Sequence, residues 1–184
     1  MPKLKTPLER AMALAAVSGS KATLGPAFLE SSRRAPRAGA WILGALGEMF
    51  LDKTGLLPAR YRPALLIPHA LAGAWVARET MRDEGVDDPS APVMGAIVAA
   101  GVAGVAPMAR MVLSRGLGVS DPLLGLAEDY LVLKLGGEAT GMTFNQMGEC
   151  AKEAVEDLRD RVAPGLELPA ASRIGVGARG GAAK

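Results

Sequence analysis

A run of nineteen residues without one ionisable side chain, residues 91–109, limits what this chain can fold into more than any other feature. A helix that crosses the hydrocarbon core of a bilayer needs about 20 predominantly apolar residues. The core helix of a soluble domain is the alternative, because an apolar run does not separate the two environments by itself. The rest of the sequence therefore has to decide between lipid and a soluble core.

The composition favours lipid. The 184 residues include 33 alanines and 23 glycines, whereas aromatic residues make up only 4%. Large side chains fill a dense soluble core, while helices rich in small residues pack closely inside membranes. A mean hydropathy of +0.21 excludes a disordered chain. A net charge of +2 without a long basic stripe argues against nucleic acid as a partner.

Several apolar segments share this character and lack a clear polar face at helical spacing. A helix that has no polar face is buried in protein or in lipid. We therefore expect an all-α, multi-span membrane protein with about four to five apolar helices, whose membrane domain covers residues 1–137. The apolar segments are residues 8–29, 38–51, 63–77, 91–109 and 123–133.

Three prolines interrupt these segments: Pro26, Pro68 and Pro107. Proline inside a helix removes a backbone hydrogen bond and kinks the helix. In lipid, such a break persists only where protein or a watery cavity satisfies the freed carbonyls. The prolines predict plain kinks, with a break beside a functional cavity as the alternative.

The sequence changes character after Gly136 and Gly137. Residues 144–162 alternate apolar and charged side chains at helical spacing, which predicts an amphipathic helix within residues 138–164. Because its charges are mixed in sign, we expect it to pack against a protein partner rather than adhere to anionic lipid. Residues 165–184, rich in Gly and Ala, are expected to form a flexible tail unless another subunit holds them.

The two halves of the chain are weakly similar. Residues 43–53 and 124–134 each start with Leu-Gly and continue with a glutamate, an aromatic residue, a leucine and a final lysine. Residues 15–19 resemble residues 99–104 more faintly, and low complexity in Ala and Gly inflates such matches. A duplication with three spans in each half would give an inverted pseudo-repeat, as in many secondary transporters.

Short motifs in these segments form a set. Gly19, Lys21, Thr23 and Pro26 lie in the first segment. The later motifs are Gly47-Glu48 before Asp52-Lys53, a loop with Pro58, Arg60 and Pro63, and the pair Glu128-Asp129. The set resembles the domain-of-unknown-function 4126 family of small bacterial integral membrane proteins, with lysine where that family usually has arginine. The resemblance covers roughly residues 15–136 and implies a multi-span helical membrane protein without an established activity.

The candidate site residues are the ionisable groups inside apolar segments: Lys21, Glu48, Asp52, Glu128 and Asp129. A charge at a helix centre costs about 2.5–3.5 kcal/mol on translocon scales, so each needs a partner or water. Lys21 with Glu48, and Arg110 with Glu128, would make neutral pairs.

Glu48 and Asp52 are four residues apart and share one helix face, where like charges would raise the pKa of one carboxyl. These groups predict a path for a proton or a cation. The alternative is a structural ion pair, or a charge that reaches the membrane interface.

The sequence gives little support for a catalytic function. Cys150 is the only cysteine, which excludes an intramolecular disulfide and a cysteine-based zinc site. His69 is the only histidine, and we expect a packing role, with a proton relay as the alternative. The sequence has no phosphate loop, metal set or cofactor fingerprint, so we expect neither an enzyme nor a bound cofactor.

Two functions stay open at this point. The first is a small transporter or channel-like protein that uses its intramembrane carboxylates. The second is a non-catalytic accessory subunit that docks a larger membrane assembly. Either would be a multi-pass protein of the bacterial inner membrane, with the lipid bilayer and a homo-oligomer or membrane protein as partners. Basic residues near the segment ends are too evenly distributed to set the orientation.

Overall fold

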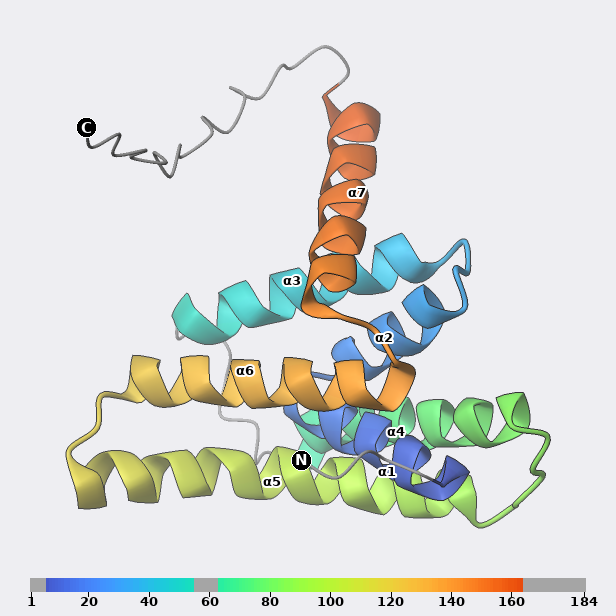
Figure 1. Cartoon of the computed structure of the whole chain (residues 1–184). Coiled ribbons are helices and arrows are strands. Elements are labelled where there is room, and N and C mark those ends of the chain that lie inside the picture. The colour runs from blue at the N-terminus through green and yellow to red at the C-terminus, as the bar shows by residue number, and fades with distance from the viewer. Residues whose placement is uncertain (1–5, 55–62, 164–184) are drawn as a thin grey trace, which may run out of the picture.

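The structure, a computed structural model, describes residues 6–54 and 63–163, and every regular element in these ranges is an α-helix (Figure 1). The all-α prediction is therefore confirmed for the described residues. The helices are α1 (Pro7–Ser20), α2 (Leu24–Ser32), α3 (Ala38–Thr54), α4 (Pro63–Asp83), α5 (Ala91–Leu117), α6 (Asp121–Thr140) and α7 (Phe144–Val162). The loop residues Pro58 and Arg60 and the predicted tail lie outside the described ranges.

The first apolar segment is not one helix. It breaks at residues 21–23 into α1 and α2, and the two helices fold back against each other. Gly25 of α2 lies so close to α1 that an added Cβ would be 2.8 Å from the carbonyl oxygen of Leu14. The two helices therefore form a hairpin with its tip at residues 21–23.

Both outer ends of this hairpin reach the same end of α4. Arg10, near the start of α1, lies 2.6 Å from Glu84, and Arg33, just after α2, lies 2.7 Å from Asp83. The hairpin thus enters the bundle and leaves it at one end, which we name the Arg33 end. The opposite end holds the α5–α6 turn and is named the Arg110 end.

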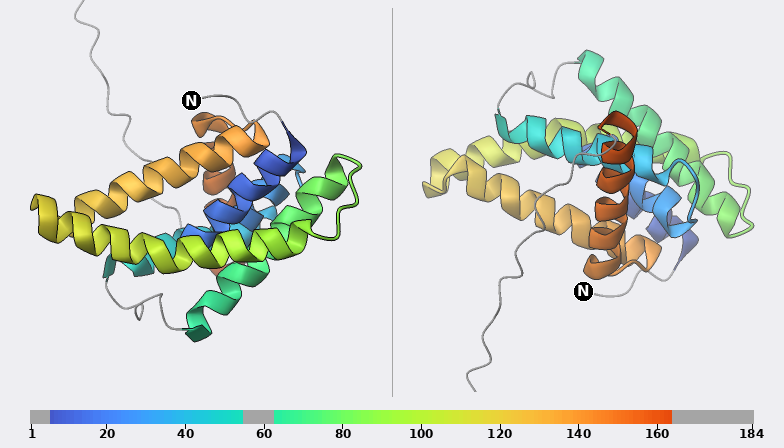
Figure 2. Two further views of the ribbon diagram at one scale, coloured as in Figure 1. Left: turned by 90° about the horizontal axis from the view of Figure 1, so that it is seen from below. Right: turned by 90° about the horizontal axis from the view of Figure 1, so that it is seen from above.

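Helices α3 to α6 run between these two ends in alternating directions (Figures 1 and 2). Asp52, in the last turn of α3, lies 3.7 Å from Arg110, which is two turns before the end of α5. Arg110 also pairs with Asp121, the first residue of α6. The carboxyl-terminal parts of α3 and α5 and the start of α6 therefore meet at the Arg110 end.

Small residues allow α4 and α5 to cross closely. A Cβ added to Gly73 of α4 would lie 2.5 Å from the carbonyl oxygen of Gly95 in α5. Ala77 and Ala99 extend the same contact, and each is four residues from its glycine. This spacing of small residues is the pattern that brings helix backbones together in membrane proteins.

The core is centred on α1, whereas the outer helices expose large apolar side chains. Ala11, Ala15 and Val17 of α1 are fully buried, while Leu71 of α4 and Ile97 of α5 are mostly exposed. Among the described helices, one is long and apolar enough to cross a membrane, through residues 91–116 of α5, and only 11% of its most apolar window is buried. By this criterion, the expected four to five spans are not supported.

Glycine and proline play other roles than the sequence predicts. Helix α6 continues through Gly136 and Gly137 to Thr140, so the predicted boundary after residue 137 falls inside a helix. A Cβ on Gly136 would overlap the ring of Phe28, which makes that glycine a packing residue. Helices α4 and α5 also continue through their internal prolines, and Pro26 lies in the first turn of α2, where an amide hydrogen has no partner within the helix.

The similar segments of the two halves are only partly inverted. Residues 43–53 and 124–134 lie on α3 and α6, which run in opposite directions (Figure 1). Residues 15–19 and 99–104 lie on α1 and α5, which run in the same direction, since Ala11 clusters with Ala91 and Gly19 contacts Ala99. The predicted inversion is therefore present in the pair on α3 and α6 and absent from the pair on α1 and α5.

Candidate functional site

The backbone of the break at the hairpin tip is capped by Glu48 of α3. The amide of Ala22 donates to Glu48 Oε1 over 3.0 Å, and the amide and hydroxyl of Thr23 donate to Oε2 over 3.2 and 2.8 Å. A carboxylate at a helix start satisfies free amides and interacts favourably with the helix dipole. Glu48 thus satisfies the free amides at the start of α2. The carboxylate of Glu48 binds these amides in place of the Lys21 side chain with which the sequence predicted it to pair.

His69 of α4 satisfies the other side of the break. In an unbroken helix the amide of Ala22 would donate to the carbonyl of Ser18, but here it donates to Glu48. The freed carbonyl oxygen of Ser18 lies 2.7 Å from Nδ1 of His69, in a buried setting. His69 therefore has the packing contact that we expected, and α3 and α4 each satisfy one of the two backbone groups that the break frees.

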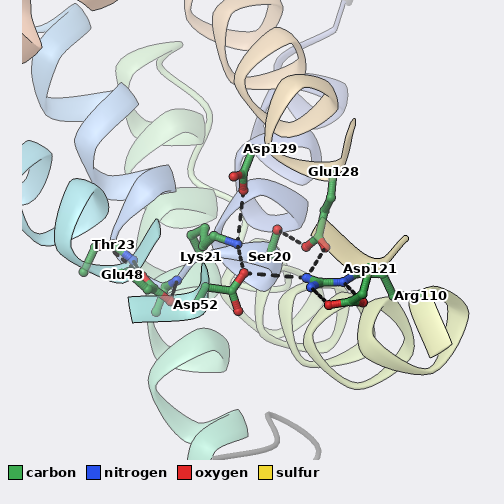
Figure 3. A network of polar contacts seen from close by, with 10 residues as sticks. Ser20, Lys21, Thr23, Glu48, Asp52, Arg110, Asp121, Glu128 and Asp129 are labelled. Carbon is green, nitrogen blue, oxygen red and sulfur yellow. Dashed lines mark hydrogen bonds and ion pairs between the residues drawn. The ribbon is translucent and has the colours of Figure 1, made fainter. Parts of the chain in front are cut away.

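Lys21 lies at the tip of the hairpin and points into the bundle (Figure 3). Only 1% of its side chain is exposed, and its Nζ lies 3.1 Å from Asp52 Oδ2 and 3.3 Å from Asp129 Oδ1. Asp52 belongs to α3 and Asp129 to α6. A single buried ammonium group therefore connects two helices that flank the hairpin.

Arg110 of α5 forms the second cationic centre. It donates through Nε and Nη2 to the two oxygens of Asp121, over 2.9 and 2.6 Å. Its Nη1 lies 3.7 Å from Asp52 and 3.6 Å from Glu128, which confirms the predicted Arg110–Glu128 pair. Glu128 also accepts a hydrogen bond from the hydroxyl of Ser20 over 2.6 Å. Asp52 is thus shared between Lys21 and Arg110.

The structure brings all five predicted site residues into this one network. With Arg110 and its partner Asp121, the network holds five carboxylates and two cations, so its fully ionised form has three excess negative charges. The side chains become more buried from Asp121, through Arg110, to Lys21. The exposure of the charged side chains therefore decreases from the surface of the Arg110 end to the hairpin tip.

Two residues of the network, Ser20 and Asp121, cannot be recognised as site residues from the sequence. Ser20 precedes the buried lysine, and Asp121 starts a helix, which is also a common capping position. Neither signal points to a charged network without the fold. In the part of the chain that the structure describes, no group of three or more His, Cys, Asp or Glu side chains is placed to hold a metal ion.

No protein-family model, curated protein or solved structure matches this chain. The geometry of the network and the exposed surface of the bundle therefore carry the functional argument.

Proposed function

We propose that this chain is a small multi-pass membrane transporter or channel-like protein, which moves a proton or another cation through the network at the hairpin tip. One observation carries the proposal: Lys21 is buried at a helix break and is shared by Asp52 and Asp129. Ionisable groups inside a membrane mark ion pathways by default. Broken helices that present charged or polar groups form the binding sites of many secondary transporters.

The exposed apolar surface supports placement in a bilayer. A core helix of a soluble protein would be mostly buried, whereas the most apolar window of α5 is 11% buried. Phe50 of α3, Leu71 of α4 and Leu126 of α6 extend the apolar exposure to the neighbouring helices. Helices α3 to α6 would supply four crossings, and α1 with α2 would be a re-entrant hairpin, which lipid tolerates when protein surrounds it.

The hairpin also supports an orientation that the sequence left open. Because both of its arms return to the Arg33 end, the arginines of the α2–α3 turn lie on the same side as those of α1 and α4. Loops rich in Lys and Arg stay in the cytoplasm, so the Arg33 end would be cytoplasmic and the network would open to the other side. Among the described residues, the Arg33 end has Arg10, Arg33, Arg34, Arg37, Arg78 and Arg82, against Lys53, Arg110 and Arg115 at the other end.

The network suggests how charge couples to movement. A proton that enters from the Arg110 end neutralises Asp52 or Asp129 and removes one of the two attractions on Lys21. The hairpin tip is then held by α3 or by α6, but no longer by both. A bound cation acts in the same way, because it competes with Lys21 for the carboxylates. A buried pair that loses one partner is strongly destabilised, which would drive the tip to a new position.

The test is flux through purified protein in liposomes. Proton uptake and monovalent cation uptake are measured for the wild type, for Asp129→Asn and Glu128→Gln, and for Glu153→Gln, an exposed carboxylate of α7, as the matched control. We expect flux above empty liposomes for the wild type and the control, and its loss in both network variants. Flux that equals empty liposomes in the wild type, or survives in both network variants, refutes the proposal.

The second candidate is an accessory subunit of a larger membrane assembly. Helix α7 extends away from the bundle (Figure 1), and Leu158 and Val162 on it are exposed. Such a subunit would co-purify with one defined partner and lose it when residues 144–184 are deleted. Its liposomes would show no flux.

A further inference from the structure

A groove with a volume of about 890 Å³ lies between α7 and the turn that joins α2 to α3. One side is formed by the end of α2, this turn and the start of α3. The other side is formed by the α6–α7 turn and residues 145–157 of α7. Among the described residues that line the groove, none belongs to the charged network. The groove is therefore a second feature, apart from the proposed ion path.

Three carboxylates of α7 line this groove. Glu149, Glu153 and Asp157 follow one another at intervals of four residues, which places them along one face of the helix. Asp157 pairs with Arg161 over 2.8 Å, but neither glutamate has an ion pair within the described parts of the chain. Arg34 is the only cation among the described lining residues. The groove thus has three carboxylates against one cation, which suits a positively charged occupant.

The segment of the chain that follows α7 has the opposite charge. Residues 168–184, which lie outside the described ranges, contain Arg173, Arg179 and Lys184 and no acidic residue. Most of the other residues in this segment are Gly or Ala. Ile174 follows the first arginine, and Ile42 of α3 provides apolar surface in the groove. The charge and the apolar content of the segment therefore both match the groove.

The connection between α7 and this segment is long enough for the segment to turn back. From residue 163 back to Glu149, α7 measures about 21 Å at 1.5 Å per residue. The ten residues 164–173 span up to about 33 Å when they are extended. A Pro-Gly dipeptide directly follows the helix, and this dipeptide favours a turn. Arg173 can therefore reach both glutamates of the groove.

We propose that residues 168–184 turn back along α7 and occupy this groove, with Arg173 and Arg179 against the carboxylates of Glu149 and Glu153. A segment tethered this closely has an effective concentration on the order of millimolar, which favours the chain's own segment over that of a second copy. The inference goes beyond the proposed function and does not depend on it. It revises the expectation of a flexible tail, because the segment joins α7 to the α2–α3 turn.

Chemical cross-linking of the full chain tests the position of the segment. In a Cys150→Ala background, the groove pair combines Ser32→Cys, which lies in the groove, with Ser172→Cys, which lies in the segment. The control pair combines Ser172→Cys with Ser120→Cys, an exposed position at the Arg110 end. A short, water-soluble bis-maleimide is applied to dilute protein in detergent micelles, and links within one chain are separated by mass from links between two chains. Tryptophan fluorescence checks that every variant is folded.

We expect the link within one chain to form several-fold faster in the groove pair than in the control pair. Glu149→Gln with Glu153→Gln should lower the rate of the groove pair to that of the control pair, and Arg173→Gln with Arg179→Gln should do the same. Combining Glu149→Lys and Glu153→Lys with Arg173→Glu and Arg179→Glu should restore the fast rate, because the attraction is then the same with the signs exchanged.

The matched control for the charge variants is Arg78→Gln with Arg115→Gln. These two exposed arginines do not line the groove, so the rate of the groove pair should stay unchanged. A rate that falls as far in this control as in the groove variants would reflect the net charge of the protein and would overturn the inference.

Three further outcomes would overturn it. Equal rates in the groove pair and the control pair would show that the groove does not hold the segment. A link that forms only between two chains would assign the groove to the segment of a second copy. A fast link that survives both glutamine variants would contradict the charge argument. None of these outcomes bears on the proposed ion path, because no network residue is among the described residues of the groove and the cross-link is measured without flux.

Discussion

Replacing Lys21 with methionine tests whether the buried ammonium holds the hairpin tip. Methionine is close to lysine in length but carries no charge, so Asp52 and Asp129 lose ion pairs of 3.1 and 3.3 Å. Removing one partner of a buried ion pair costs about 3–5 kcal/mol. Asp52 still has Arg110 at 3.7 Å, so we expect a loss near the lower limit, about 3 kcal/mol in the free energy of unfolding.

The measurement is equilibrium unfolding in mixed micelles. Trp41 and Trp75, which stack with ring centroids 5.9 Å apart, provide a fluorescence signal for tertiary structure. The control is Lys152→Met on the exposed surface of α7, which should stay within about 0.5 kcal/mol of the wild type. Adding Asp129→Asn to Lys21→Met removes the carboxylate that lost its cation, and should recover about 1–2 kcal/mol.

Two results would refute the reasoning. The first is a Lys21→Met variant that is no less stable than the Lys152→Met control, because Lys21 would then not be a buried charge held by carboxylates. The second is a double variant whose loss equals the sum of the two single losses, since independent sites add and coupled sites do not.

Three further predictions concern two backbone contacts and the hydrogen bonds that Asp88 accepts just before α5. Gly95→Ala pushes a methyl group against the backbone of α4 and should lower the free energy of unfolding by about 1–3 kcal/mol. Gly101→Ala meets open space and should raise the free energy of unfolding by up to about 1 kcal/mol through helix propensity. Equal stability of the two variants in thermal unfolding would contradict the close crossing of α4 and α5. His69→Ala leaves the carbonyl of Ser18 without its partner and should lower the free energy of unfolding by about 1–3 kcal/mol. His69→Asn keeps a hydrogen-bond donor and should lose less stability than His69→Ala in denaturant unfolding. Hydrogen bonds from the hydroxyl and amide of Ser90 hold the pKa of Asp88 below its ordinary value, so its contribution to stability is complete above the pKa of the unfolded chain and is lost as pH falls through the folded-state pKa. An NMR titration of the Asp88 carboxyl should show the pKa returning toward its ordinary value in Ser90→Ala, and an unchanged titration would count against the hydroxyl contact.

Local sequence patterns were sufficient for most helices. The spacing of apolar and charged residues predicts α7 at residues 144–162, which are its bounds in the structure. The uninterrupted apolar run predicts the greater part of α5. The break at residues 21–23 could not be placed in this way, because Lys21, Ala22 and Thr23 include neither Gly nor Pro. It is held by side chains of α3 and α4, which are distant in sequence.

The candidate site was predictable as a set of residues but not as a set of contacts. Charges inside apolar segments require partners wherever they lie, so composition and position identify the five residues. Their pairing depends on the break. Once the start of α2 presents free amides, those amides take Glu48, and Lys21 pairs with Asp52 and Asp129 instead. Helix spacing places Glu48 and Asp52 on one face, but it does not show that they serve different partners.

The hairpin has a consequence for how the protein is made. Its arms have 14 and 9 residues, or about 21 and 14 Å of helix, while the hydrocarbon core of a bilayer is about 30 Å thick. In the proposed membrane placement, neither arm can be threaded through the bilayer by itself as it leaves the ribosome. Lys21 also finds its two carboxylates only after α3 and α6 have been synthesised. The hairpin is translated before α3 and α6 and yet reaches its final position after them, once they have formed a cavity for it.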